Sequence, residues 1–272
     1  MPELPEVETT RRGLLPLRGR TIRGVTVRQR RLRWPIASGL ERAVAGATVT
    51  DLRRRAKYVL IETDRGTLIV HLGMSGTLLW CEEPPPPAAH DHVDFHVAGA
   101  VGAVVRYRDP RRFGSIHWTK GDVERHRLLC HLGPEPLEDG FDGAHLHRLS
   151  RGKNRASRDF LLDGRVVAGV GNIYANEALF VAGVRPGRAA GRVGRASWDR
   201  VAVALREILA DAVAAGGTTL RDYRGASGES GEYSRSLGVY GRDGEKCSRC
   251  SGVVRRRTRG GRSMFYCPDC QH

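Results

Sequence analysis

Four cysteines near the carboxyl end restrict the fold more than any other feature of this 272-residue chain. They form two Cys-x2-Cys pairs, Cys247 with Cys250 and Cys267 with Cys270, separated by sixteen residues. Two such pairs, each on a tight turn, can present four thiolates at the corners of a tetrahedron, which is the geometry of a structural zinc site. Two disulfides would need an oxidising compartment, for which the sequence carries no signal. The pattern therefore predicts one structural Zn²⁺ that takes no part in catalysis.

The segment between the two cysteine pairs predicts a basic hairpin. Residues 253–266 contain two short runs of strand-forming and basic residues, joined by Gly260 and Gly261. A glycine pair at this place is typical of a tight turn between two antiparallel strands. We expect the tip of this hairpin to follow a phosphate backbone.

The chain carries a large excess of positive charge, with 45 Lys and Arg against 30 Asp and Glu and a formal net charge of +15. Basic residues gather in the runs 28–33, 53–57 and 255–262. One such run is often only a solvated face, but three runs indicate a polyanionic partner, with nucleic acid ahead of an anionic membrane surface. No stretch approaches the roughly 18 apolar residues of a membrane span. We expect a cytoplasmic protein.

Three regions differ in their sequence pattern, and they predict a multidomain α+β protein. Residues 2–15 predict a short helix, and residues 20–120 predict a strand-rich sandwich or barrel interrupted by a loop at the prolines 84–87. Helical spacing follows, most clearly in residues 197–215, where Ser197 is a candidate N-cap and glycines end the pattern. The expected domains are residues 1–130, 131–225 and 226–272.

The segment from Gly169 to Asn172 lies directly before a helical pattern at residues 173–180. Glycines allow close approach of a ligand to the backbone, Asn172 is a candidate helix cap, and a helix N-terminus attracts phosphate. Taken alone, this short segment favours a structural turn over a phosphate site.

The N-terminus carries a candidate nucleophile. Removal of Met1 would leave the secondary amine of Pro2, and the positive end of the following helix disfavours its charged form. Glu3 lies beside it and could act as a general acid or base. On these residues alone, an ordinary helix start remains the more common explanation.

Ten separated strings extend over essentially residues 2–271 and, together, closely resemble the formamidopyrimidine-DNA glycosylase family, which is shared with endonuclease VIII. The strings are PELPEVETTRRGL, RRAKYVL, HLGMSG, HDHVD, RYRDPRRFG, HLGPEPL, GVGNIYANEALF, GGTTLRDY, YGRDGEKCSRC and FYCPDCQ. The resemblance implies an N-terminal β-sandwich, a helix-two-turn-helix domain and a C-terminal β-hairpin zinc finger, with double-stranded DNA in the cleft between them. It also implies a monomer, because that cleft is built within one chain.

The resemblance implies a bifunctional base-excision-repair enzyme, a DNA-formamidopyrimidine glycosylase and abasic-site lyase. Pro2 matches the family's nucleophile, Glu3 its catalytic carboxylate, and Lys57 a basic residue near the lesion and its phosphate. An amine that attacks the sugar C1′ expels the base and forms a Schiff base, after which β,δ-elimination cleaves the strand. Oxidised purines, namely 8-oxoguanine and formamidopyrimidines, are the expected substrates, together with abasic sites.

Two further groups of residues are implied to contact DNA. A glycosylase extrudes its target nucleotide, so other side chains must occupy the space left in the duplex. Met74, Arg111 and Phe113 match these void-filling residues, with Arg111 facing the orphaned base. Asn172 and Arg262 match phosphate binders that pinch the backbone, while His90 is a DNA-side or structural residue.

Some positions depart from the family pattern. Glu229 and Glu232 lie in a Gly/Ser-rich stretch at residues 223–235, expected to be a mobile loop, where relatives usually carry an aromatic residue that covers the extruded base. Residues 157–159 replace a typical Ile-Lys pair, and Met264 replaces a small residue. Three alternatives stay open: a glycosylase shifted towards oxidised pyrimidines, a non-catalytic binder of damaged DNA, and a zinc-ribbon transcription or recombination factor, which would leave the N-terminal strings unexplained.

Overall fold

The computed structural model describes residues 1–99, 102–218 and 233–272. They fall in two compact units, one made of residues 1–130 with 215–218 and the other of residues 131–214 with 233–272. The helical segment and the cysteine module therefore share a unit. Residues 215–218, directly after the longest helix, belong to the N-terminal unit. The division into three domains at 130 and 225 stays a prediction.

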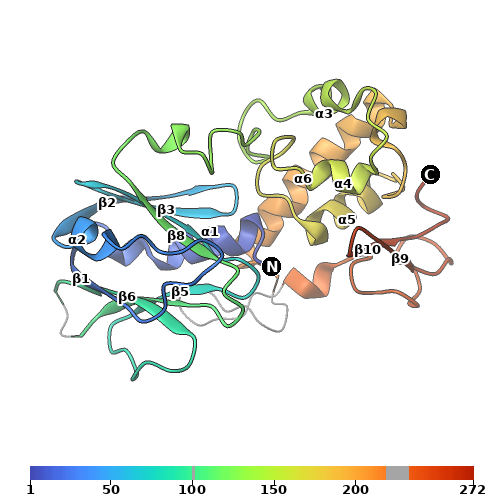
Figure 1. Cartoon of the computed structure of the whole chain (residues 1–272). Helices are drawn as coiled ribbons and strands as arrows, with labels where there is room; N and C mark the ends of the chain where they lie inside the picture. The colour runs from blue at the N-terminus through green and yellow to red at the C-terminus, as the bar shows by residue number, and fades with distance from the viewer. Residues whose placement is uncertain (100–101, 219–232) are drawn as a thin grey trace. The chain divides into compact units, whose positions relative to one another are not determined.

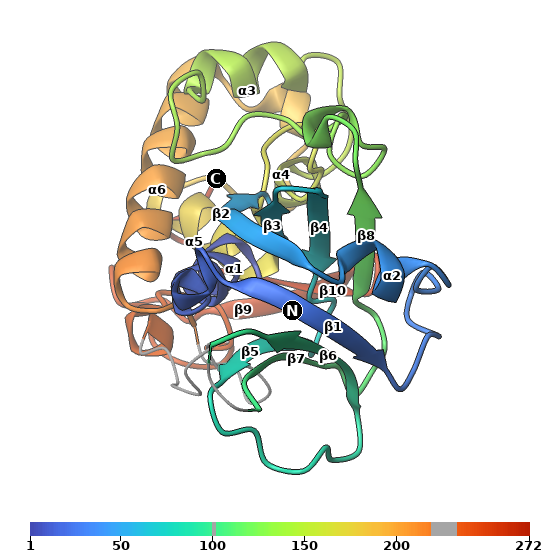
Figure 2. The same cartoon turned by 90° about the vertical axis from the view of Figure 1, so that its left-hand side faces the viewer.

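The N-terminal unit is a β-sandwich preceded by a helix. One antiparallel sheet, in the order β5-β7-β6-β1-β2-β3-β4-β8, folds over at the short pairing of β1 with β2. Figure 2 shows the two layers, with β2, β3, β4 and β8 in one and β1, β5, β6 and β7 in the other. The elements are α1 (Leu4–Gly13), η1 (Leu15–Leu17), β1 (Thr21–Val27), α2 (Leu40–Val44), β2 (Ala47–Arg55), β3 (Tyr58–Thr63), β4 (Gly66–His71), β5 (Thr77–Cys81), β6 (Asp91–Val97), β7 (Val104–Arg108), β8 (Ser115–Thr119) and η2 (Val123–Arg125).

The strands follow the pattern that the sequence predicts. The strand-rich region predicted for residues 20–120 is confirmed, since all of the strands β1 to β8 lie between Thr21 and Thr119. The prolines 84–87 lie in a loop, as predicted. Alternating residues of both layers fill one apolar core.

Helix α1 is shorter than predicted, since Pro2 and Glu3 precede its first turn. Pro5 is tolerated in that turn because the amide hydrogen that it lacks would have no helical partner there. Glu8 and Arg12, one turn apart on this helix, form an ion pair with 3.0 Å between Oε1 and Nε. The helix buries Leu4, Pro5, Glu6, Val7 and Thr10.

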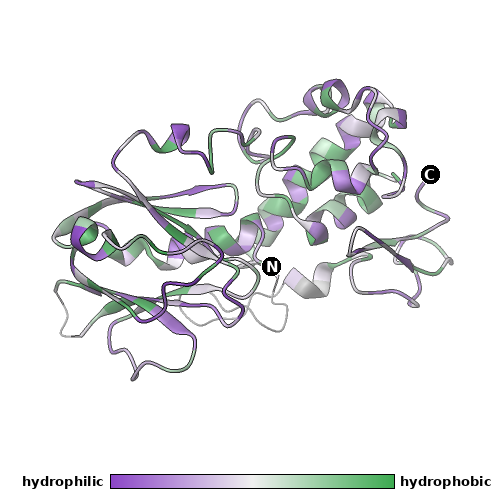
Figure 3. Cartoon of the chain, in the orientation of Figure 1, coloured by the Kyte–Doolittle hydropathy of each residue, from purple (hydrophilic) through white to green (hydrophobic). Residues whose placement is uncertain are grey.

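The second unit combines helices with a two-stranded hairpin (Figure 1). Figure 3 shows apolar stretches along α5 and α6, which pack against each other. The elements are α3 (Gly143–Ser150), α4 (Ser157–Leu161), α5 (Asn172–Val181), η3 (Ala190–Arg192), α6 (Arg195–Ala214), η4 (Tyr233–Ser236), β9 (Arg255–Arg259) and β10 (Arg262–Tyr266). No helix among the described residues is long and apolar enough to cross a membrane.

Two predicted helix caps are wrong. Helix α6 begins at Arg195, so Ser197 lies inside it and its side chain accepts from Arg200. Gly171, not Asn172, is the N-cap of α5, because the side chain of Asn172 is committed to other partners. The backbone N–H groups of Ser197 and Trp198 both donate to the Gly194 carbonyl, so α6 starts ahead of the predicted cap.

The predicted hairpin is confirmed. Strands β9 and β10 pair in antiparallel register from Arg262 opposite Arg259 to Tyr266 opposite Arg255. Gly260 and Gly261 have φ of 58° and 71°, the left-handed conformations that a two-residue turn of this kind requires. Every residue of β9 is exposed, so its basic side chains are presented to solvent.

Candidate functional site

Pro2 and Glu3 are buried at the start of α1, while Met1 is exposed. The backbone N–H of Glu3 donates to Oε2 of Glu6 at 2.8 Å. The other oxygen of the Glu6 carboxylate accepts the backbone N–H of Thr218 at 2.7 Å. A buried carboxylate thus ties the chain start to a segment more than two hundred residues away, and it fixes where the amine exposed by loss of Met1 would lie.

Glu6 and Gly217 are residues that the sequence interpretation missed. Gly217 has a φ of 87°, and a Cβ on it would lie 3.0 Å from Oε1 of Glu6, so a glycine allows this close approach. The available signal was the three-residue spacing of Glu3 and Glu6, which is the spacing of a capping box.

Lys57 lies in the tight turn between β2 and β3, next to Ala56 with a φ of 52°. Across the β3–β4 pairing, the rings of Tyr58 and His71 are 4.9 Å apart. Burial, followed by the positive charges of Lys57 and Arg33, lowers the pKa of His71 to about 4. The ring is therefore neutral near pH 7.

The structure brings the three predicted void-filling residues together on two neighbouring loops. Met74 lies in the β4–β5 loop, and Arg111 and Phe113 lie in the β7–β8 loop. A Cβ on Gly73 would lie 2.4 Å from the backbone N of Gly114, so these loops are in direct contact. Met74 and Phe113 are 40% and 45% exposed, and the Arg111 guanidinium carbon lies 4.9 Å from the Phe113 ring centroid. Large apolar side chains grouped at the surface indicate a binding face.

Asp109 organises both loops, and it too was missed. Its carboxylate is fully buried and accepts Ser75 Oγ at 3.0 Å from the β4–β5 loop. From the β7–β8 loop it accepts the backbone N–H groups of Arg111 at 3.3 Å and Gly114 at 2.8 Å. The hydroxyl of Tyr107 donates to it at 3.2 Å. One buried anion therefore spans both loops that carry the void-filling residues.

His90 adjoins the same corner. It is exposed with a φ of 77°, and its backbone carbonyl accepts the N–H of Asp109 at 3.1 Å. The ring of His92 is buried and lies 2.8 Å from the Asp109 carbonyl through Nε2, which makes it a structural residue. Among the described residues, the cysteine cluster is the only group suited to a metal, so the histidines at 90, 92 and 96 do not form one.

Asn172 and Arg262 adjoin each other in the second unit. Asn172 is the first residue of α5, and its Nδ2 donates to the carbonyl of Ser263 at 3.0 Å. Arg262 precedes Ser263 and is exposed at the start of β10. The two predicted phosphate binders, ninety residues apart in sequence, are therefore joined through the hairpin backbone.

Arg158, one of the departures from the family pattern, connects Asn172 to the backbone of the hairpin. Its side chain is 1% exposed, and its Nη1 donates to Oδ1 of Asn172 at 2.9 Å. It also donates to the carbonyls of Ser263 at 3.3 Å and Arg259 at 3.2 Å, and it pairs with Asp159 at 2.7 Å. Burial lowers the pKa of Arg158. Of the other departures, Met264 is buried in β10, whereas Glu229 and Glu232 lie outside the described residues.

The four cysteines fit a zinc ion. Their ligand atoms all lie within 4.8 Å of one another, with 3.9 Å between the sulfurs of Cys247 and Cys270 and 3.5 Å between those of Cys250 and Cys267. Tetrahedral Zn–S bonds of about 2.3 Å place sulfurs roughly 3.8 Å apart, so little adjustment is needed. Four thiolates complete the coordination, which makes this zinc site structural.

These features define a zinc-containing protein with a β-sandwich, a helical segment and an exposed arginine-rich hairpin. Three family models match it in order: the formamidopyrimidine-DNA glycosylase N-terminal domain at residues 1–116, the H2TH domain of that glycosylase at residues 132–224, and the zinc finger found in FPG and IleRS at residues 244–272. The chain belongs to the formamidopyrimidine-DNA glycosylase family, which confirms the resemblance and the expected fold.

Relatives resemble it over their whole length. The formamidopyrimidine-DNA glycosylases of Alkalilimnicola ehrlichii and Methylococcus capsulatus are 55% and 52% identical, and all of each chain is covered. The structure of the Fpg (MutM) protein of Thermus thermophilus superposes with a TM-score of 0.87 at 38% identity, covering 99% of this chain and 98% of that one. A Lactococcus lactis Fpg mutant in complex with Fapy-dG containing DNA gives a TM-score of 0.92 at 32% identity, with both chains fully covered.

Proposed function

We propose that this chain is a bifunctional DNA glycosylase and abasic-site lyase that removes 8-oxoguanine and formamidopyrimidines from duplex DNA in base excision repair. The observation that carries the proposal is the buried Pro2–Glu3 start of α1, anchored through Glu6, in a chain that belongs to this family along its whole length. A Lactococcus lactis relative has been crystallised with Fapy-dG containing DNA, which supports the substrate class. We infer that the protein acts as a monomer.

The proposed reaction begins once Met1 is removed. The Pro2 nitrogen bonds to the sugar C1′ as the glycosidic bond breaks, and the base leaves with a proton. Glu3 gives a proton to O4′ as the sugar C1′–O4′ bond breaks, which opens the ring and leaves an iminium between the Pro2 nitrogen and C1′. Lys57 contributes positive charge at the lesion phosphate. The iminium acidifies the C2′ proton, whose loss expels the 3′ phosphate, and a second elimination expels the 5′ phosphate. Hydrolysis then returns the free amine.

The remaining residues would make the target accessible. Met74, Arg111 and Phe113 would enter the space left by the extruded nucleotide, which offsets part of the few kcal/mol lost on unstacking. Arg111 would face the orphaned base, for which cytosine is the expected partner. Asn172 and Arg262 would hold the phosphates on either side, and His90 would lie on the DNA side of the void-filling loops.

Reductive trapping tests the proposal. Borohydride added during reaction with an 8-oxoguanine duplex should give a covalent complex whose protein attachment maps to the Pro2 nitrogen. A chain with a short N-terminal extension that is not removed is the matched control, and it should bind the duplex without being trapped. Attachment at Lys57, or trapping of the extended chain, would overturn the assignment of Pro2.

Glu3→Gln separates chemistry from binding. Because the carboxylate serves proton transfer, duplex affinity should stay within about threefold while base excision falls by at least about a hundredfold. Excision at the wild-type rate would remove Glu3 from the mechanism. Duplex binding without any trapped adduct in the wild-type protein would instead favour a non-catalytic binder of damaged DNA.

A preference for oxidised pyrimidines is the second candidate, because wild-type Lactococcus lactis Fpg has been crystallised with an oxidized pyrimidine containing DNA. Single-turnover rates on matched duplexes with 8-oxoguanine, formamidopyrimidine or an oxidised pyrimidine would decide between the two. We expect the purine lesions to be removed faster. Glu232→Tyr should raise 8-oxoguanine excision selectively, because a carboxylate beside DNA is repelled by the phosphates.

A further inference from the structure

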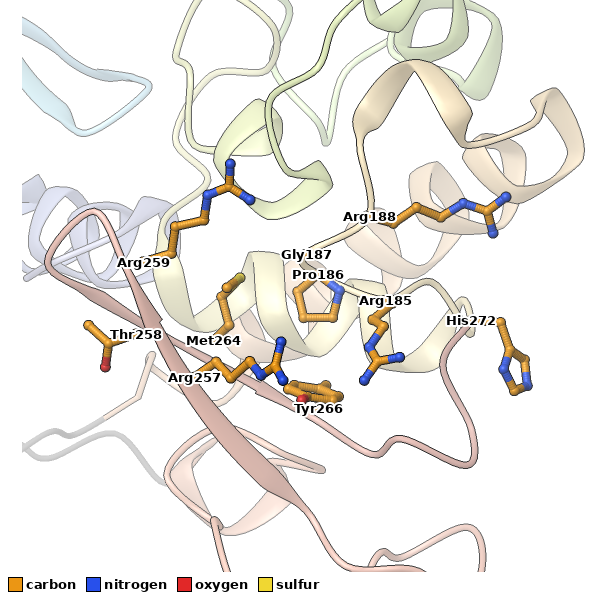
Figure 4. A pocket seen from close by; sticks show the side chains of 10 residues that line it. All are labelled: Arg185, Pro186, Gly187, Arg188, Arg257, Thr258, Arg259, Met264, Tyr266 and His272. Atoms are coloured by element: carbon orange, nitrogen blue, oxygen red, sulfur yellow. The ribbon is translucent and has the colours of Figure 1, made fainter.

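We propose that the second unit carries an accessory phosphate-binding site, distinct from Asn172 and Arg262, that takes a phosphate ester of a nucleic-acid strand. The site is a cavity of about 520 Å³ beside the zinc hairpin. That volume falls in the range of pockets that hold small ligands. Figure 4 shows its lining, which includes Arg185, Arg188, Arg257, Arg259, Met264 and Tyr266.

The cavity concentrates positive charge that the described protein does not neutralise. Four arginines line it, together with His272, and no lining residue is acidic. Arg259 has Asp159 at 3.9 Å, whereas Arg185, Arg188 and Arg257 have no ion pair among the described residues. Like charges gathered in this way repel each other, and an entering anion would reverse that cost. A planar guanidinium suits a phosphate better than a lone ammonium does.

The frame of the cavity is already in place. The turn that carries Arg185 and Arg188 is closed by the N–H of Arg188 donating to the Arg185 carbonyl at 3.0 Å. The N–H of Arg185 donates to the His272 carbonyl at 3.1 Å, and the N–H of Ser157 donates to the Arg188 carbonyl at 2.7 Å. A binding site whose backbone is fixed before the ligand arrives loses less entropy on binding.

The hairpin residues that line the cavity suit it to a nucleic-acid strand. Met264 and Tyr266 are buried, and the guanidinium of Arg185 lies 5.0 Å from the Tyr266 ring centroid. Arg257 pairs with Met264, and Arg259 pairs with Arg262. Cross-strand partners and alternate residues share one face of a hairpin, so Arg257 and Arg259 lie on the same face as Arg262. A strand held at Arg262 would meet these arginines next.

The test is the salt dependence of binding to undamaged duplex DNA. It compares a double variant of the cavity, Arg185→Gln with Arg257→Gln (the cavity pair), with a control double variant, Arg148→Gln with Arg151→Gln. The control removes equal charge from exposed residues of α3 and its C-cap, outside every site described above. Fluorescence anisotropy over a range of KCl concentrations gives the slope of log Kd. We expect the slope to fall by about 1 to 2 for the cavity pair, with affinity near 100 mM salt reduced about tenfold, and to stay constant for the control.

Equal changes in both pairs, or no change in the cavity pair, would overturn the site. Zinc content and Tm, measured for each variant, show whether the fold is intact. Titration with dAMP and inorganic phosphate separates two sources of the same chemistry. Loss of dAMP binding in the cavity pair with an unchanged slope would assign the phosphate site to free nucleotides.

The inference rests on the proposed action on DNA, but the two fail differently. The excision rate at saturating enzyme should stay within about twofold of wild type in both pairs, because neither touches Pro2 or Glu3. A wild-type protein that shows the slope but no excision would sink the proposed function and leave the accessory site standing.

Discussion

The two units of this protein hold their exposed side chains in different ways. In the N-terminal unit, the loops with Met74, Arg111 and Phe113 extend from a sandwich with a large apolar core. The cysteine module has only a small cluster, in which two of the buried residues are zinc ligands. This apolar cluster is too small to offset the conformational entropy that the module loses on folding. Zinc binding must therefore supply the stability that apolar burial supplies in the sandwich.

Each unit also contains a buried charged side chain that holds its exposed residues in place. It is the carboxylate of Asp109 in the N-terminal unit and the guanidinium of Arg158 in the second unit. The Asp109 carboxylate accepts hydrogen bonds from hydroxyl groups and from backbone N–H groups of two loops. Arg158 only donates, and it collects Asn172 and two hairpin carbonyls, while its Nε has no hydrogen-bond partner in the described structure. Asp109 therefore joins two loops of one unit, whereas Arg158 joins α5 to the hairpin in the other.

Zinc removal should have the largest effect. Structural zinc contributes on the order of 10 kcal/mol in small modules, so chelation should unfold the hairpin and weaken duplex binding by at least about a hundredfold. The sandwich should stay folded, because its core contains no metal ligand. Hydrogen exchange with and without chelator would resolve the two units. Loss of protection in both would show that they do not differ in their need for metal.

Asp109→Asn should come next. The amide nitrogen would meet donors, leaving a buried group unsatisfied at a cost of about 1 to 3 kcal/mol. Excision from an 8-oxoguanine duplex should fall at least about tenfold, while cleavage of single-stranded abasic DNA, which needs no void filling, should change little. Exposed Asp139→Asn is the control. Equal losses on both substrates would reduce Asp109 to a general stabilising residue.

Arg158→Met should have a smaller effect of a different kind. Without the guanidinium, Asn172 and the hairpin lose their link, at about 1 to 2 kcal/mol, so duplex affinity should fall about tenfold and zinc should be released faster. The excision rate at saturating enzyme should stay near wild type. Arg158→Lys should restore part of the affinity, because an ammonium keeps donors but not the fork. A reduced saturating rate with unchanged zinc release would contradict this division of roles.

The effect that is smallest near neutral pH concerns the titration of His71. The pKa of His71 falls from 6.5 to about 4 in the fold, so its neutral form stabilises the sandwich above pH 6.5 and this contribution is lost as pH falls towards 4. Neutral His71 also accepts the N–H of Gly73 at 3.0 Å, at the start of the Met74 loop. His71→Gln should flatten the dependence of unfolding free energy on pH in this window by at most about 1 kcal/mol per pH unit. Burial also lowers the pKa of His117 to about 4, so His117 should account for a similar share of the pH dependence. An unchanged pH profile of the unfolding free energy in His71→Gln would refute the role of His71.

The sequence by itself determined the features that depend on local chemistry and spacing. The spacing of the four cysteines predicts the zinc site, the glycine pair predicts the tight turn of the hairpin, and the strand-forming runs at residues 20–120 predict the sandwich. These predictions are confirmed. Family strings, read as a whole, identified the fold and the reaction class. The assignments of Pro2, Glu3 and Lys57 stay predictions until the trapping experiment is done.

Only the tertiary structure decided which distant groups meet. Asp109, Arg158 and Glu6 each bond to groups distant in sequence as well as to near ones. A backbone N–H or carbonyl is the same in every sequence, so no pattern marks it as a distant partner. The predicted cap at Asn172 failed for the same reason, since Arg158 and the Ser263 carbonyl, both distant in sequence, hold its side chain. A buried charge finds its partners in space, and that information exists only after the chain has folded.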